Sequence, residues 1–108
     1  MKIIACRVGQ KAVYDDVYNH LYHLQRFVGG YIETISSPTG FVIVCDEEGQ
    51  LKNLPDNPTI DPITAAMWRW PVVIKGNYLI CGQKGDELTD IPDDQLTNVL
   101  INILNEVR

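Results

Sequence analysis

Hydrophobic side chains recur along the chain in short runs and alternations that predict β-strands. Residues 3–8 form an apolar run that stops at Gly9, and residues 41–45 form a second run rich in β-branched side chains. Residues 31–35 alternate apolar with polar side chains, and the turn-forming stretch 36–40 connects them to the second run. The pattern therefore predicts an N-terminal strand and, later, an antiparallel hairpin.

Apolar spacings of three and four residues predict two main helices. The stripe of the first helix consists of Tyr18, Leu21, Leu24 and Val28. Asp15 and Asp16 precede this stripe as expected N-cap residues, and Gly29 follows it as the expected closing residue. The stripe of the last helix consists of Leu96, Val99, Leu100, Ile103, Leu104 and Val107. Pro92 and three nearby aspartates mark the N-terminal turn of this last helix.

The remaining segments predict a short helix and a second hairpin. Asp61-Pro62 is a typical helix start, which predicts a short helix over residues 63–70. Gly76-Asn77 is a two-residue turn signal between the apolar stretches 72–74 and 78–80, and residues 83–90 are predicted to be loop.

Together these elements predict an α+β fold over residues 1–108 as a single small domain. Its mostly antiparallel sheet is expected to consist of two hairpins plus the N-terminal strand, with the helices on one face.

Composition and charge narrow the classes of function. The 108 residues are 45% hydrophobic, and no apolar run approaches the roughly 18 residues of a membrane span, so we expect a cytoplasmic protein without a membrane partner. The net charge of −5 resides in residues 85–108, where six acidic residues face one arginine. Because phosphates must be neutralised by Lys and Arg, this balance disfavours direct nucleic-acid binding.

Neither the cysteines nor the histidines indicate a catalytic or metal site. Cys6, Cys45 and Cys81 each lie in an apolar run and none forms a Cys-x-x-Cys pair, which predicts three reduced, buried thiols. His20 and His23 share a helix face, but no third ligand accompanies them at a spacing typical of metal sites. We therefore expect no metal and no cofactor.

Carboxylates gather around the first predicted hairpin. Its register brings Glu33 near Asp46, and Glu47 and Glu48 follow directly. Paired carboxylates can divide acid and base roles or hold a hard cation, but an Asp-Glu-Glu-Gly stretch is also typical of a solvated turn. The residues alone leave both interpretations open.

Several stretches together resemble a known family. Leu24-Gln25 followed by Val28-Gly29-Gly30-Tyr31-Ile32-Glu33 is similar to the signature of the family catalogued as domain of unknown function 3846. The acidic turn within residues 44–51, Leu54-Pro55 with Asn57, and residues 74–82 resemble its other marks. The resemblance covers a core of about residues 20–82 and leaves an acidic C-terminal helix at about 92–107. Asp46 stands where the family more often has Asn.

This resemblance implies a phage or mobile-element protein for which no catalytic activity is established. We therefore expect a non-catalytic module that binds a small polar, nucleotide-like ligand or a host protein and thereby counters a host defence. The ligand-binding residues that the family signature implies are Gln25, Tyr31, Glu33, Asp46, Glu47 and Asn57, with Gly29, Gly30 and Gly49 as structural turn residues.

Two alternatives from other classes of function stay open. The acidic C-terminal segment predicts a DNA-mimic interaction protein, because wide negative potential attracts DNA-binding partners. Glu33, Asp46 and Glu47 predict a metal-assisted hydrolase if their carboxylates converge on metal ions. Exposed hairpin edges can also pair with a second copy, so a homo-oligomer is a further expectation.

Overall fold

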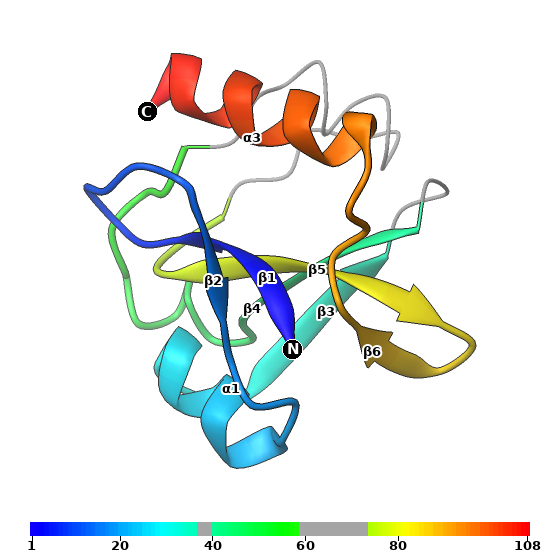
Figure 1. Ribbon diagram of the computed structural model, residues 1–108. Coiled ribbons are helices and arrows are strands. Elements are labelled where there is room, and N and C mark those ends of the chain that lie inside the picture. The colour runs from blue at the N-terminus through cyan, green and yellow to red at the C-terminus, as the bar shows by residue number, and fades with distance from the viewer. Residues whose placement is uncertain (37–39, 59–73) are drawn as a thin grey trace.

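The computed structural model describes residues 1–36, 40–58 and 74–108 (Figure 1). The elements are β1 (Lys2–Cys6), β2 (Val13–Asp16), α1 (Leu21–Val28), β3 (Ile32–Ser36), β4 (Phe41–Asp46), β5 (Tyr78–Lys84), β6 (Glu87–Thr89) and α3 (Gln95–Val107). The six strands form one sheet in the order β2-β1-β5-β4-β3, with β6 beside β5, and every pairing is antiparallel. The predicted α+β class and the mostly antiparallel sheet are therefore confirmed.

The two helices cover opposite faces of the sheet (Figure 1). Leu24 and Val28 of α1 pack against one set of alternating strand residues, which includes Ile3, Val44 and Leu79. The buried side chains of α3 pack against the other set, which includes Ile4, Cys6, Ile43 and Ile80. The prediction that the helices share one face is wrong. Every residue of β4 is buried, and a strand that is apolar on both sides requires cover on both sides.

The two strands of the first predicted hairpin pair antiparallel, and the end of α1 is as expected. β3 pairs antiparallel with β4, with Glu33 opposite Cys45. Gly29 adopts a left-handed conformation with φ of 90°, and its N–H donates to Gln25 O at 2.8 Å.

The predicted start of α1 is wrong. His20 is the N-cap, because its Nδ1 accepts from the Tyr22 N–H at 3.3 Å, whereas Asp15 and Asp16 belong to β2. β2 is largely exposed and has little apolar pattern, so the spacing of hydrophobic residues could not predict that it pairs with β1.

The second predicted hairpin is not formed by the described residues. β1 and β4 pair with the two edges of β5, so neither edge of Leu79 or Ile80 is free for a hairpin partner. Ile74 lies outside any strand, and Lys75 makes only an isolated bridge to Asp56. β5 instead turns back into β6 around Gly85, with φ of 61°, where a loop was predicted. The predicted short helix over residues 63–70, and residues 72 and 73, lie outside the described residues.

The last helix begins as predicted but faces the core with a different side. The carboxylate of Asp94 accepts from the Thr97 N–H at 2.9 Å, which caps α3. Thr97, Leu100, Ile101 and Leu104 are buried. The predicted stripe members Leu96 and Val99 are exposed. Within the described ranges, neither helix has the length and apolar character needed to traverse a lipid bilayer.

All three cysteines are free and buried in the core, as predicted. Burial raises the pKa of Cys6 to about 11 and the pKa values of Cys45 and Cys81 to about 12. These thiols therefore stay protonated near neutral pH and serve as packing residues.

Candidate functional site

The predicted ligand-binding residues lie in three places rather than in one pocket. Glu33, Asp46 and Glu47 line a hollow of about 280 Å³ beside the first hairpin. Gln25 and Tyr31 line a separate hollow of about 300 Å³ near the end of α1. Asn57 lines neither of these hollows and is almost fully buried. The structure therefore does not bring these residues together in one hollow.

Asp46 has a structural partner for each of its carboxylate oxygens. Its side chain is completely buried, and Oδ2 lies 2.7 Å from Nζ of Lys52. Oδ1 accepts from the Glu48 N–H at 2.8 Å, and Lys52 also donates to Gly29 O at 3.2 Å. This arrangement ties the turn after β4 to the end of α1. Each carboxylate oxygen of Asp46 thus has a partner within the protein, which gives this side chain a structural role, and ligand contact by Asp46 stays a prediction.

Two glycines leave room for this turn. A methyl group at Gly30 would overlap Lys52 Nζ and lie 3.0 Å from Asp46 Oδ2, so the end of the Lys52 side chain would have to shift. A methyl group at Gly49 would lie 2.8 Å from the carbonyl oxygen of Lys75. Both positions thus require a close approach of backbone to neighbouring atoms.

Asn57 holds together three distant parts of the chain. Its Nδ2 donates to Cys6 O at 2.8 Å and to Gly76 O at 2.9 Å. Its Oδ1 accepts from Nη1 of Arg108 at 2.6 Å. Both amide donors and one acceptor site of this buried side chain are used within the protein, which gives Asn57 a structural role. Ligand binding by Asn57 stays a prediction.

The geometry also bears on the metal-assisted alternative. Across residues 1–36, 40–58 and 74–108, no group of three or more His, Cys, Asp and Glu side chains is placed to hold a metal ion. Asp46, the central member of the expected set, is paired with Lys52 instead. The rings of His20 and His23 meet edge to face with centroids 6.0 Å apart, which is a packing contact.

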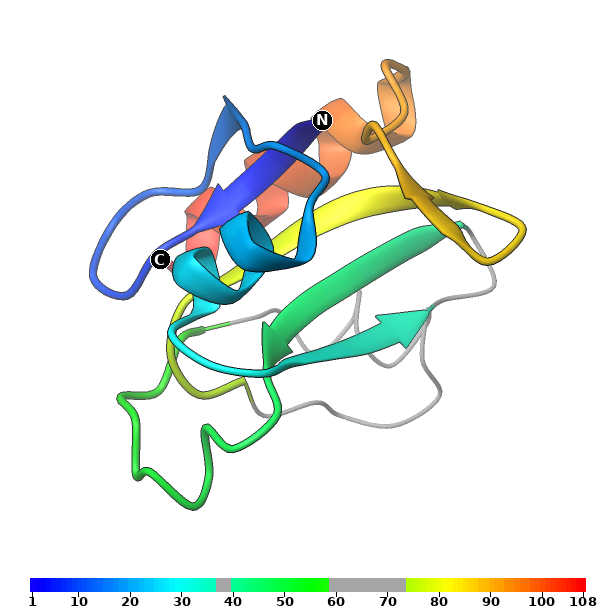
Figure 2. The same cartoon turned by 90° about the horizontal axis from the view of Figure 1, so that it is seen from below.

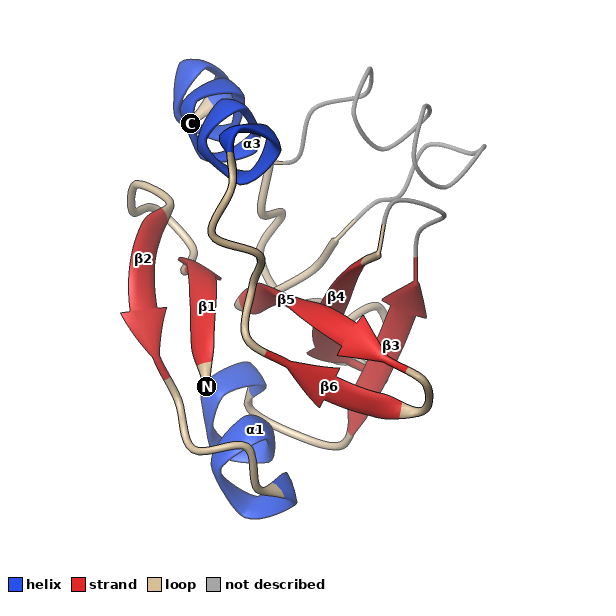
Figure 3. Ribbon diagram, turned by 45° about the vertical axis from the view of Figure 1, so that its right-hand side comes forward, coloured by secondary structure: helices blue, strands red, loops and turns tan. Residues whose placement is uncertain are grey.

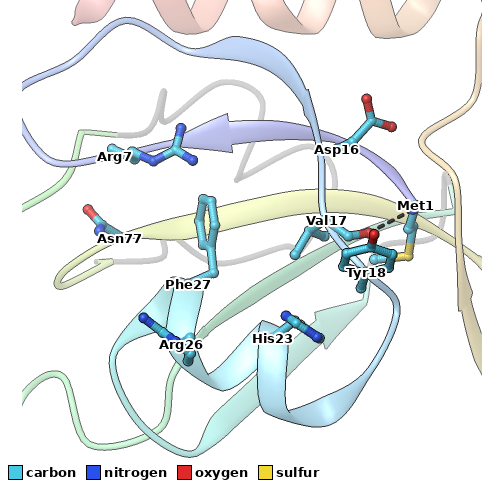
Figure 4. Close-up of a pocket in the computed structure, with 9 residues that line it drawn as sticks. All are labelled: Met1, Arg7, Asp16, Val17, Tyr18, His23, Arg26, Phe27 and Asn77. Atoms are coloured by element: carbon cyan, nitrogen blue, oxygen red, sulfur yellow. Dashed lines mark hydrogen bonds between the residues drawn. The ribbon is translucent and has the colours of Figure 1, made fainter.

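A larger groove lies between α1 and the strands β1 and β2, with a volume of about 810 Å³ (Figure 4). Its chemistry-bearing lining residues are Arg7, Asp16, Tyr18, His23, Arg26 and Asn77. Figure 2 shows how α1 runs alongside β1 and the connection from β2, which form the walls. In Figure 3, β1 and β2 lie at the end of the sheet away from β3. The groove is thus separate from both hollows beside the first hairpin.

Two arginines in the groove are held in place by aromatic side chains. The guanidinium carbon of Arg7 lies 4.8 Å from the centroid of the Phe27 ring, and Nη2 of Arg7 lies 3.2 Å from Oδ2 of Asp15. Arg26 donates to the hydroxyl of Tyr22 at 3.2 Å and lies 5.8 Å from that ring. Such contacts orient a guanidinium while leaving other N–H groups free to bind an anion.

The ion pair with Arg7 also contributes to a lowered pKa of the Asp15 carboxyl group. The Asp16 N–H and the Arg7 side chain, which both donate to Asp15, lower the pKa of that carboxyl below its usual value. Arg7 therefore lies in a polar network and is only about one-third exposed.

Aromatic rings gather around His23 at another part of the groove. The rings of Tyr18 and His23 have centroids 5.1 Å apart at an interplanar angle of 47°. The rings of Tyr22 and His23 pack edge to face, with their centroids 5.3 Å apart. Tyr18 is 76% exposed although it lines the groove, so a broad aromatic face is open to solvent.

The sequence analysis missed this groove because its walls come from four separated segments. One of the two walls includes β2, which was not predicted. A partial signal existed, because His23, Arg26 and Phe27 have the three- and four-residue spacings that place side chains on one helix face. That face combines a cation with aromatic rings, a mixture that an ordinary core-facing stripe lacks.

Comparison with known proteins identifies the family. A family model described as domain of unknown function (DUF3846) matches residues 1–103. Searches of the curated proteins and of the solved structures returned no match to the chain. The matched range extends past residues 20–82 at both ends and includes most of α3, as well as every segment of the groove. The chain therefore belongs to the DUF3846 family.

Proposed function

We propose that the protein is a non-catalytic binding module that holds a small organic anion in the groove between α1 and the strands β1 and β2. The observation that carries this proposal is the placement of Arg7 and Arg26 in one groove, each oriented by an aromatic ring. The volume of about 810 Å³ lies within the range of roughly 300–1,000 Å³ that is typical of small-molecule sites.

The charge distribution supports an anionic ligand. The whole chain carries a net charge of −5, yet the groove lining has two arginines against one carboxylate, that of Asp16. A local positive potential within an acidic protein selects small anions while the remaining surface repels polyanions such as DNA. Guanidinium groups bind carboxylates and phosphates through paired N–H donors.

A small ligand accounts for the groove better than a host protein does. The groove is concave, and its polar groups converge from α1, the residue after β1, the end of β2 with the connection that follows it, and the segment before β5. A module that binds such an anion without converting it acts by sequestration. We propose this as the route by which a protein of a phage or mobile element counters a host defence in the cytoplasm.

The acidic-mimic alternative has less support. The carboxylate of Asp94 caps α3, and Oδ1 of Asp90 accepts from the Lys2 N–H at 2.8 Å. Two of the six acidic residues in the C-terminal segment are therefore engaged in holding the fold.

Isothermal titration with ribose 5-phosphate, a small organic phosphate, tests the proposal. We expect saturable heat that Arg26→Ala reduces by about tenfold in affinity, because one charge-assisted contact is lost. Lys84→Ala removes the same charge from an exposed position of β5 outside the groove and is the matched control. Absence of heat, or equal loss in both variants, contradicts the proposal.

A further inference from the structure

The groove has a cationic part and an aromatic part. In Figure 4, the guanidinium groups of Arg7 and Arg26 lie on the Asn77 side of Phe27, whereas Tyr18 and His23 lie on the other side. A ligand that fills the groove therefore meets positive charge at one end and ring faces at the other. A simple inorganic anion uses only the first of these two environments.

The aromatic part has the properties of a stacking platform. Tyr18 is mostly exposed and lies against His23, which in turn contacts Tyr22, so the rings support one another. Nucleic-acid bases stack on tyrosine and histidine faces in many binding proteins because every base offers a π-face.

The one carboxylate in the lining lies away from the arginines. Figure 4 places Asp16 on the Tyr18 side of the groove. There it can accept a hydrogen bond from a sugar hydroxyl or an exocyclic amino group, as acidic residues do in other nucleotide sites. At the cationic end, Asn77 is fixed because its Oδ1 accepts from the Val8 N–H at 2.8 Å.

We infer that the anion bound in this groove is a mononucleotide, with its phosphate at Arg7 and Arg26 and its base against Tyr18 and His23. This inference rests on the proposed function and adds the chemical class of the ligand to it. The net charge of −5 favours a single nucleotide over a nucleic-acid strand, because an acidic chain as a whole repels a polyanion more strongly than it repels one phosphate.

Isothermal titration with AMP, ribose 5-phosphate and adenosine separates the two parts of the groove. We expect AMP to bind about tenfold more tightly than ribose 5-phosphate, since stacking of one base contributes at about that level. Tyr18→Ala removes this advantage and leaves the affinity for ribose 5-phosphate unchanged, whereas Tyr18→Phe retains the advantage. Arg26→Ala weakens both phosphates, and Lys84→Ala weakens neither.

The outcomes distinguish the inference from the proposed function. Equal affinities for AMP and ribose 5-phosphate in the unaltered protein overturn the nucleotide but leave an anion site. Absence of binding by either phosphate overturns both. Tighter binding of a ten-residue oligothymidylate than of AMP or TMP overturns the inference in favour of a nucleic-acid strand. Thermal unfolding of each variant confirms that it is folded, which is expected because Tyr18 and Arg26 are surface residues.

Discussion

Arg7, which directly follows β1, lies with its guanidinium carbon 4.8 Å above the ring of Phe27 on α1. This contact joins the two walls of the groove and fixes the direction of the cation. Asp15, which belongs to β2, forms an ion pair with Arg7 and is the second restraint. A change in either restraint should therefore alter anion binding without removing the positive charge of Arg7 or Arg26.

Replacement of Phe27 by leucine tests the first restraint. The variant keeps an apolar side chain but loses the ring face, and cation–π contacts at partly exposed sites contribute about 0.5–1 kcal/mol. We expect the affinity for ribose 5-phosphate to fall by about two- to fivefold in isothermal titration. Phe27→Tyr keeps the ring and is the control, with unchanged affinity. Equal loss in both variants means that the ring itself is not the restraint.

Replacement of Asp15 by asparagine tests the competing carboxylate. The variant removes a negative charge beside Arg7 while it retains an acceptor oxygen. We expect ribose 5-phosphate to bind about three- to fivefold more tightly, because a unit charge at this distance near a surface contributes at about that level. Asp86→Asn, on the exposed turn between β5 and β6, removes the same charge as a control and should leave affinity unchanged. Unchanged or weaker binding of ribose 5-phosphate by the Asp15 variant contradicts this prediction.

The lowered pKa of Asp15 makes a second, pH-dependent prediction. A carboxyl group with a lower pKa in the folded state stabilises that state above its unfolded pKa of about 3.9 and loses this effect as pH falls through the folded value. The Tm difference between the unaltered protein and the Asp15→Asn variant should be full above about pH 5 and shrink below about pH 4. Thermal unfolding across this range checks it, and a constant difference contradicts it.

Asn57 should matter for stability rather than for binding. Its loss removes the amide donors from the carbonyl oxygens of Cys6 and Gly76 and one of the acceptors of Arg108. Since each unsatisfied buried group costs about 1–3 kcal/mol, we expect Asn57→Ala to lower the free energy of unfolding by about 2–3 kcal/mol. Asn102→Ala, at an exposed position of α3, should change it by less than about 0.5 kcal/mol. Urea unfolding measures both, and similar values for the two variants would assign Asn57 no special role.

The three thiols should be unreactive in the folded protein. Burial raises their pKa values to about 11 or 12, so both access and the thiolate fraction are small at pH 8. We expect an aromatic disulfide reagent to label none of Cys6, Cys45 and Cys81 within minutes, and all three after addition of denaturant. Rapid labelling of any cysteine without denaturant contradicts the burial of that residue.

The sequence could predict those elements whose local pattern and tertiary environment agree. Gly29 closes α1 and Asp94 caps α3, because both signals act within one helical turn. The apolar run of β4 correctly predicted a buried strand. The same run also carried the information that both faces of the sheet are covered, since no residue in it is polar until Asp46.

The elements that were missed depend on partners far along the chain. β2 is polar and exists because its backbone pairs with β1, so side-chain spacing could not show it. Tyr78–Ile80 was placed in a local hairpin, yet its partners are β1 and β4, which lie over thirty residues away. Local turn chemistry at Gly76-Asn77 was a weaker determinant than burial at the centre of the sheet.

The candidate site follows the same rule. The family signature drew attention to Asp46 and Asn57, whose side chains stabilise the fold through Lys52 and Arg108. Polar residues of a family signature can be retained for buried hydrogen bonds as well as for ligands. The groove depends on the antiparallel return of β2 beside β1 and on the orientation of α1, and neither of these can be read from spacing.

Backbone amide chemical-shift mapping tests the location of the binding site most directly. In a titration of the ¹⁵N-labelled protein with AMP, we expect the largest changes at the amides of Arg7, Tyr18, Arg26 and Asn77, which line the groove. The amides of Glu33, Glu47 and Gly49, which line the hollow beside the first hairpin, should change little. Changes confined to that hollow, or no saturable change at any residue, would contradict the account.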